Sequence, residues 1–389
     1  MLKLVARRYD TGRPVEVQID GCRIAQIQPA REQLGLPIIA PGFVDLQING
    51  YGGVEFNDPA LTIEQVRAVS LAFDPFGVTR FLATCTTDGH LTLAHSFAVI
   101  AQACRESPQA AARILGIHME GPYISPADGP RGAHPKQHVR PPDWDEFRRL
   151  QDAAEGRIRL LTLSPEYDGA AEFIAQVVAA GVLVAIGHTQ ATTEQLRAAV
   201  DAGARMSTHL GNGAHPLLKR HPNYIWDQLA DDRLTASLIT DGHHLPAAVV
   251  RTMVRAKTPE RCVLVTDITG MAGMPPGRYS TGLGDLEVLP DGRLVIAGQR
   301  DILAGASQPL TVCIANARRF TGLDWQTVVE MASLTPLKLL KEPAAGLEPG
   351  APADLTLFDE PANDTAPLQI RLTVNHGAVV YERIPRPQS

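Results

Sequence analysis

Apolar runs alternate with amphipathic segments through the middle of the chain. The runs are short and rich in Val, Ile and Leu, and segments such as residues 170–180 and 193–202 have helical spacing between them. Apolar runs of this length are typical of parallel strands that are covered on both faces. The runs predicted as strands are residues 43–48, 80–85, 114–119, 159–163, 182–187, 205–210, 235–240 and 262–267.

Eight buried strands with helical crossovers predict an α/β fold, a (β/α)₈ TIM barrel. A doubly wound open sheet would have the same local pattern and is the alternative. A hairpin insertion is predicted at residues 285–298, with its turn at Pro290-Asp291-Gly292.

The two ends of the chain have a different pattern, with short strand-like segments separated by turn residues. These segments are residues 2–7, 14–20 and 23–28 at one end, and residues 353–358, 372–374 and 378–384 at the other. We therefore expect residues 1–40 and 345–389 to form one small β-sandwich domain. The barrel would then span residues 41–344.

Composition and charge narrow the class of protein. The 389 residues are 44% hydrophobic, which is ample for a large core, and the net charge of −6 gives no reason to expect nucleic acid or an anionic membrane as partner. No apolar stretch is long enough for a signal peptide or a membrane span. The five cysteines are dispersed, as in a cytoplasmic enzyme with reduced thiols: Cys22, Cys85, Cys104, Cys262 and Cys313.

Chemically active residues stand at the ends of four of the predicted strands: Glu120, His188, His209 and Asp267. In a (β/α)₈ barrel, these ends carry the catalytic groups. Two imidazoles and a carboxylate are a typical three-ligand set for a catalytic metal ion with an open position for water. A free aspartate beside that water would take its proton and pass it to a leaving amine.

Each of these residues also has an ordinary structural explanation. A histidine after a strand is commonly only hydrogen-bonded, and Glu120 or Asp267 would serve equally well to cap the following segment. Their joint placement on four separate strands of one pattern favours the metal site.

Segments in order along nearly the whole chain resemble the amidohydrolase superfamily and, within it, the N-acetylglucosamine-6-phosphate deacetylases. The segments include PGFVDLQING (41–50), HMEGPYIS (118–125), RGAH (131–134), IGHTQAT (186–192), STHLGNG (207–213), TDGHHL (240–245), VTDITGMAG (265–273), ILAGAS (302–307), SLTPLKLL (333–340) and GLEPGAPADLTLFD (346–359).

The resemblance implies a role for each matching residue. Glu120, His188 and His209 would bind the metal, and Asp267 would be general base and then general acid. His244 would polarise the acetamide carbonyl and stabilise the oxyanion. The residues implied to contact the sugar phosphate are His134, Asn212, Gly213 and Arg220, the last of which reaches in from a neighbouring subunit in some relatives.

Many amidohydrolases hold a second metal with His-x-His on the first strand, where this chain has Gln47-x-Asn49. Neutral amides are poor ligands for a transition metal, so the second position is expected to be vacant. The implied cofactor is one divalent ion per chain, with Zn²⁺ first and Fe, Co or Mn as alternatives.

The implied activity is hydrolysis of the N-acetyl group of N-acetylglucosamine 6-phosphate to glucosamine 6-phosphate and acetate, by a homodimer. Residues 211–226 depart from the family pattern, and His215, His221 and Trp226 match no family role. Deacylation of another N-acyl amino sugar or of an N-acyl amino acid is therefore the first alternative. A catalytically inactive binding protein is the second, and the presence of Asp267 with all three ligands argues against it.

Overall fold

A parallel barrel forms the centre of the computed structural model, which describes residues 1–281, 284–343, 346–363 and 365–384. Its strand order is β14-β13-β12-β11-β10-β9-β8-β5, and a parallel bridge between Ile48 and Ile268 brings the two edges together. The predicted TIM barrel is confirmed. Its strands are β5 (Phe43–Ile48), β8 (Val78–Thr86), β9 (Ile114–Glu120), β10 (Ile158–Leu163), β11 (Leu183–Ile186), β12 (Met206–Ser207), β13 (Thr235–Ile239) and β14 (Cys262–Val265).

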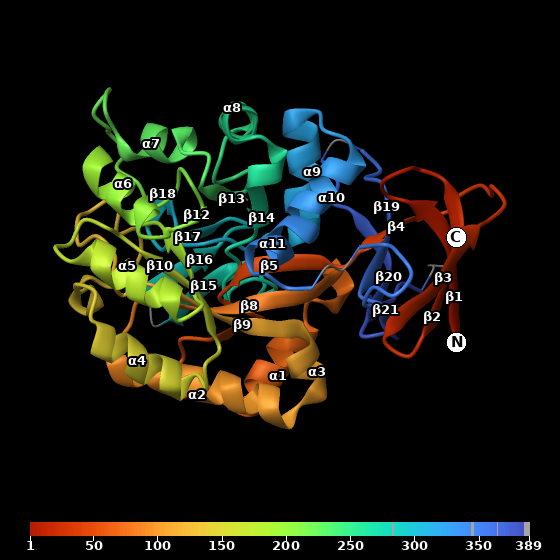
Figure 1. Ribbon diagram of the computed structural model, residues 1–389, viewed down its shortest axis with the longest axis horizontal. Coiled ribbons are helices and arrows are strands. Elements are labelled where there is room, and N and C mark those ends of the chain that lie inside the picture. The colour runs from red at the N-terminus through yellow and green to blue at the C-terminus, as the bar shows by residue number, and fades with distance from the viewer. Residues whose placement is uncertain (282–283, 344–345, 364, 385–389) are drawn as a thin grey trace.

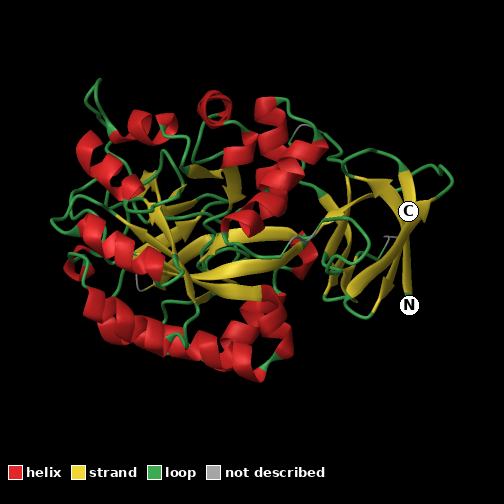
Figure 2. Cartoon of the chain, in the orientation of Figure 1, coloured by secondary structure: helices red, strands yellow, loops and turns green. Residues whose placement is uncertain are grey.

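Helices surround this barrel (Figure 2). Two of them begin with a capping box, in which Thr62 pairs with Gln65 and Thr192 pairs with Gln195, and each box satisfies backbone N–H groups at the start of its helix. The helices are α1 (Ile63–Leu71), α2 (His90–Glu106), α3 (Pro108–Arg113), α4 (Trp144–Ala153), α5 (Ala170–Ala179), α6 (Thr193–Asp201), α7 (Tyr224–Ala230), α8 (Ala247–Lys257), α9 (Leu310–Thr321), α10 (Trp325–Met331) and α11 (Leu334–Leu339).

Strands from both ends of the chain form one separate seven-stranded sheet, which carries both termini at the right of Figure 1. β4 joins the two halves, because it pairs parallel to β1 and antiparallel to β19. The strands are β1 (Leu2–Arg8), β2 (Pro14–Asp20), β3 (Arg23–Pro29), β4 (Ile38–Pro41), β19 (Leu355–Asp359), β20 (Gln369–Asn375) and β21 (Ala378–Glu382).

We infer from this sheet that residues 1–40 with 345–389 are one domain and residues 41–344 the other. The boundary at residues 344–345 and the last five positions lie outside the described residues.

The predicted hairpin insertion is part of a four-stranded antiparallel sheet, which we call the insertion sheet. β16 pairs with β17 across the predicted turn. Met271 and Ala304, from the barrel segments on either side, pack with the apolar side chains of this sheet in one buried cluster. The strands are β15 (Gly277–Thr281), β16 (Gly284–Val288), β17 (Leu294–Ile296) and β18 (Gln299–Leu303), and a small hairpin, β6 (Gly50–Tyr51) with β7 (Val54–Glu55), follows β5.

The barrel interior is filled by side chains rather than being a pore. One buried apolar cluster there includes Val44, Leu82, Leu160 and Val263, each from a different strand. All five cysteines are free thiols. Within the described ranges, no helix combines the length and apolar character needed to cross a bilayer.

Candidate active site

The four residues singled out from the sequence come together at one end of the barrel. Glu120 is the last residue of β9, while His188, His209 and Asp267 each lie two residues beyond the ends of β11, β12 and β14. These three residues have positive φ values of 50°, 28° and 55°. Such backbone conformations are costly for residues other than glycine and are concentrated at functional sites.

Three ligand-type atoms converge to nearly equal separations. The Nε2 of His188 lies 3.1 Å from Glu120 Oε1, the Nε2 of His209 lies 3.0 Å from the same oxygen, and the two Nε2 atoms are 3.0 Å apart. The Nδ1 of His188 donates to the carbonyl of Pro130 at 2.9 Å. In the neutral ring, this bond leaves the Nε2 lone pair directed at the other two atoms.

Such a cluster fits a divalent cation. Two imidazole nitrogens and a carboxylate oxygen present lone pairs to one point, and these would repel each other unless a cation or shared protons lay between them. The backbone of Gly213 packs closely against the ring of His188, since a Cβ at this position would lie 2.7 Å from His188 Nδ1. This contact helps to fix the ring in place. The chemistry of the donors therefore matches a metal site.

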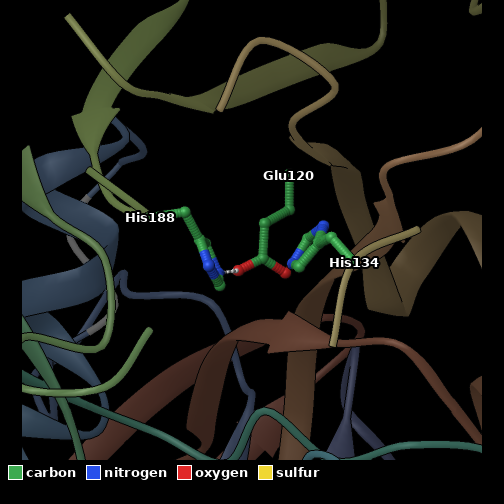
Figure 3. A group of neighbouring side chains, drawn as sticks. All are labelled: Glu120, His134 and His188. Atoms are coloured by element: carbon green, nitrogen blue, oxygen red, sulfur yellow. Dashed lines mark hydrogen bonds and ion pairs between the residues drawn. The ribbon is translucent and has the colours of Figure 1, made fainter. Parts of the chain in front are cut away.

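His134 extends this cluster on its other side. Figure 3 shows Glu120, His134 and His188 pointing toward one another, and these three residues form a buried group whose ligand atoms all lie within 4.8 Å. His134 Nδ1 is hydrogen-bonded to Thr87 Oγ1 at 2.8 Å. Burial and the neighbouring His188 lower the pKa of His134 to about 3, so the ring is neutral.

Two overlapping ligand sets are thus present, one with His134 and one with His209. We favour the set with His209, because its Nε2 is 3.0 Å from both Glu120 Oε1 and His188 Nε2. Burial opposes the charge on Glu120, but the close approach of His188 and His209 outweighs it and holds the pKa of this carboxyl well below its usual range.

Asp267 lies beside the cluster and is held by the two amides of the first strand. Gln47 donates from Nε2 to Asp267 Oδ1 at 3.0 Å and to Glu120 Oε1 at 3.0 Å, and Asn49 donates to Asp267 Oδ1 at 2.8 Å. Burial and the charge of Glu120 raise the pKa of Asp267 to about 6. A carboxyl tuned to this range suits proton transfer near neutral pH.

His244 lies in the segment after β13, where its Nδ1 is hydrogen-bonded to Asp241 Oδ2 at 2.7 Å. Burial is the largest single effect on Asp241 and raises its pKa. The hydrogen bond to His244 and those from the local backbone N–H groups together outweigh burial, so the pKa of Asp241 is lowered. An ionised Asp241 orients the ring of His244 by accepting its Nδ1–H.

A cavity of about 1090 Å³ opens over these groups. It is lined by the predicted residues Asn49, Glu120, His134, His188, His209, Asn212, Gly213, His244 and Asp267. Arg220 is exposed and does not line the cavity of this single chain. His215 is tied to Tyr224, whose hydroxyl lies 3.0 Å from its Nδ1, so it holds the loop.

Several buried polar residues next to the site were not among the predicted site residues. Asp45 accepts from Thr266 Oγ1 at 2.6 Å, and His118 Nε2 lies 2.7 Å from Thr162 Oγ1 inside the barrel. Glu55 lines the cavity and accepts from the backbone N–H of Gly270 at 2.7 Å. Asp45 and His118 could have been found because each is a charged or polar residue inside an apolar run, FVDLQI and ILGIHM.

A TIM barrel with a His/His/carboxylate cluster and a neighbouring buried aspartate at its strand ends is typical of a metal-dependent hydrolase. The model of the amidohydrolase family matches residues 38–380, and the chain belongs to this family.

The relatives of the chain are similar over most of their length. A human protein named N-acetylglucosamine-6-phosphate deacetylase is 33% identical over 92% of this chain and 87% of its own. An Escherichia coli O157:H7 protein named N-acetylgalactosamine-6-phosphate deacetylase is 34% identical over 83% of this chain and 84% of its own.

Solved structures agree with these relatives. N-acetyl-D-glucosamine-6-phosphate deacetylase from Mycobacterium smegmatis matches with a TM-score of 0.87 and 33% identity, covering 98% of this chain and 100% of that chain. A mutant of the same enzyme, in complex with N-acetyl-D-glucosamine-6-phosphate, matches with a TM-score of 0.86 and 32% identity over the same shares.

Proposed function

We propose that this chain hydrolyses the N-acetyl group of N-acetyl-D-glucosamine 6-phosphate to D-glucosamine 6-phosphate and acetate. The convergence of Glu120, His188 and His209 beside Asp267 carries the proposal, because this arrangement fits amide hydrolysis with a bound cation. Named relatives that act on amino-sugar phosphates supply the substrate class.

Glu120, His188 and His209 are the residues that would hold one divalent ion, with Zn²⁺ first among Zn, Fe, Co and Mn. When bound, such an ion polarises a carbonyl and lowers the pKa of a coordinated water. Gln47 and Asn49 donate to carboxylates, so their amides act as hydrogen-bond donors in the place where a second metal would need ligands.

Asp267 takes the proton of the attacking water and returns it to the departing amine nitrogen. Both amides of the first strand donate to Oδ1 of this carboxylate, which leaves Oδ2 for the proton. The same group serves as base and then as acid, so no second carboxylate is required for the proton transfer.

His244 stabilises the negative charge that develops on the carbonyl oxygen. Its Nδ1–H is engaged by Asp241, so Nε2 can donate to the oxyanion only when the ring is protonated. Asp241 keeps the ring in the orientation that this contact requires. His134, Asn212 and Gly213 line the cavity where the sugar phosphate would lie.

A homodimer completes this proposal. Arg220 lies on a loop that exposes Leu217, and helix α7 after this loop exposes Trp226; 89% and 52% of their surfaces are accessible. A second copy that packed on this face would remove both side chains from water. If a second copy packs against this loop, Arg220 of one chain would reach the cavity of the other chain and contact the phosphate there. We place the enzyme in the cytoplasm because its five thiols are free.

The decisive test is acetate release from a small panel of substrates. The panel contains N-acetylglucosamine 6-phosphate, N-acetylgalactosamine 6-phosphate, unphosphorylated N-acetylglucosamine and an N-acetyl amino acid. We expect the highest kcat/KM with N-acetylglucosamine 6-phosphate and loss of activity after chelation. A higher kcat/KM with any other member would overturn the assigned substrate.

A further inference from the structure

A single permanently charged cation faces the candidate active site within one chain. Of the Lys and Arg side chains that the structure describes, Arg293 alone lines the cavity, whereas five carboxylates do: Glu55, Asp58, Asp88, Glu120 and Asp267. An anionic substrate in this cavity would meet the proposed divalent ion at Glu120 and, from the described Lys and Arg side chains, Arg293. Arg293 is therefore notable by its charge as well as by its position.

The sequence places Arg293 at the tip of the insertion sheet, directly after Pro290-Asp291-Gly292. The turn is closed by bonds from Leu289 N to the Arg293 carbonyl and from Gly292 N to the Leu289 carbonyl, both at 2.9 Å. Ser307 donates from its hydroxyl to the carbonyl of Gly292. This bond attaches the turn to the segment that leads from the sheet back into the barrel.

The guanidinium of Arg293 has one edge occupied and one edge open. Its Nε donates to Asp291 Oδ2 at 2.8 Å, and neither Nη atom has a hydrogen-bond partner among the residues that the structure describes. The side chain is 39% exposed and lines the cavity, so an anion in the cavity can reach it. Two parallel Nη–H donors match the geometry of two oxygens of a phosphate.

We propose that Arg293 is a specificity-determining residue that binds the phosphate of the substrate from within the same chain. The proposal rests on the proposed function, since that function supplies a phosphorylated sugar. Asp291 holds the guanidinium in place through Nε, and the Nη edge receives the anion. The insertion sheet then contributes to substrate selection in addition to covering the cavity.

Kinetics of Arg293→Ala on N-acetylglucosamine 6-phosphate and on N-acetylglucosamine test this proposal. The kcat/KM ratio between the two sugars should fall by roughly ten- to a hundred-fold, as expected for a lost hydrogen-bonded contact to a charged group. Arg293→Lys should recover part of the ratio, because a lysine keeps the charge but not the two-donor edge. Both variants are checked for a wild-type melting temperature.

Arg278→Ala is the matched control. Arg278 lies on β15 of the same sheet, is 71% exposed, and does not line the cavity. The Arg278→Ala variant should retain the wild-type ratio of kcat/KM between the two sugars. An unchanged ratio in Arg293→Ala, or an equal loss on both sugars, would overturn the role of Arg293 while leaving the proposed function intact. Wild-type enzyme that hydrolyses neither sugar would instead refute the proposed function, and this proposal with it.

Discussion

The side-chain amide of Asn49 donates to Oδ1 of Asp267 at 2.8 Å, across the point where the first and last strands of the barrel meet. Asn49 is thereby joined to the carboxylate that we propose transfers the proton. This bond stabilises the ionised form of Asp267 and lowers its pKa, against the larger effects of burial and Glu120.

Removing the amide of Asn49 should therefore shift the pH dependence of catalysis. A general base works only when deprotonated, so kcat/KM falls as the pH drops through its pKa. That pKa is about 6 without a metal, and a bound cation would lower it. In Asn49→Ala, the pKa of Asp267 rises and the acidic limb of the kcat/KM profile should move to higher pH.

The exposed amide of Gln326, on α10, provides the control for this measurement. Gln326→Ala should keep the wild-type limb. An Asn49→Ala profile that superimposes on wild type would show that the amide does not tune Asp267.

Asp267→Asn tests the acid–base role itself. An asparagine keeps the size of the side chain but cannot accept the proton of water, so kcat should fall by roughly 10²–10⁴-fold. Metal content should stay near the wild-type value, because Asp267 is not one of the three favoured ligands. Elemental analysis and steady-state kinetics on the same preparation measure both. Near-normal turnover would remove Asp267 from the mechanism.

Metal content also distinguishes the two overlapping ligand sets. His209 Nε2 lies 3.0 Å from both Glu120 Oε1 and His188 Nε2, whereas His134 Nδ1 is engaged by Thr87. We expect His209→Asn to lose the ion after dialysis and His134→Asn to retain it, with one ion per wild-type chain. The reverse result would assign the site to Glu120, His134 and His188. Two tightly bound ions in active wild type would contradict the vacant second position.

The barrel was predictable from sequence because each of its strands is a separate apolar run. Even β12, only Met206–Ser207 in the structure, lies inside the predicted run at residues 205–210. β12 pairs with each neighbouring strand through only two residues, and the apolar side chains around it are what made the strand predictable. The positions of Glu120, His188, His209 and Asp267 at strand ends follow from the same pattern.

The contacts around the cavity were less predictable, because they depend on tertiary placement of loops. The family resemblance pointed to Arg220 for the phosphate, whereas in the single chain Arg220 lies outside the cavity and Arg293 lines it. The predicted turn at residues 290–292 is local information, whereas its attachment to Ser307 is not. Asp45 and His118 were missed since the apolar runs around them outweighed their own polarity.

Arg220 therefore allows a test of assembly as well as of recognition. In one chain it is exposed and does not line the cavity, so a role in phosphate binding requires a second chain. Arg220→Ala should then cost about 1.5–3 kcal/mol in kcat/KM for the 6-phosphate sugar and little for the unphosphorylated one. Kinetics on both sugars and light scattering over a range of protein concentrations measure the effect.

Mass action makes the outcome specific to a dimer. If Arg220 acts across an interface, dilution of wild type below its dissociation constant should reproduce the loss seen in Arg220→Ala, because each cavity then loses the partner's guanidinium. Lys219→Ala, at the neighbouring exposed position, should keep the wild-type preference. A monomer with full preference for the 6-phosphate sugar would exclude Arg220, and the phosphate would then depend on groups of the same chain.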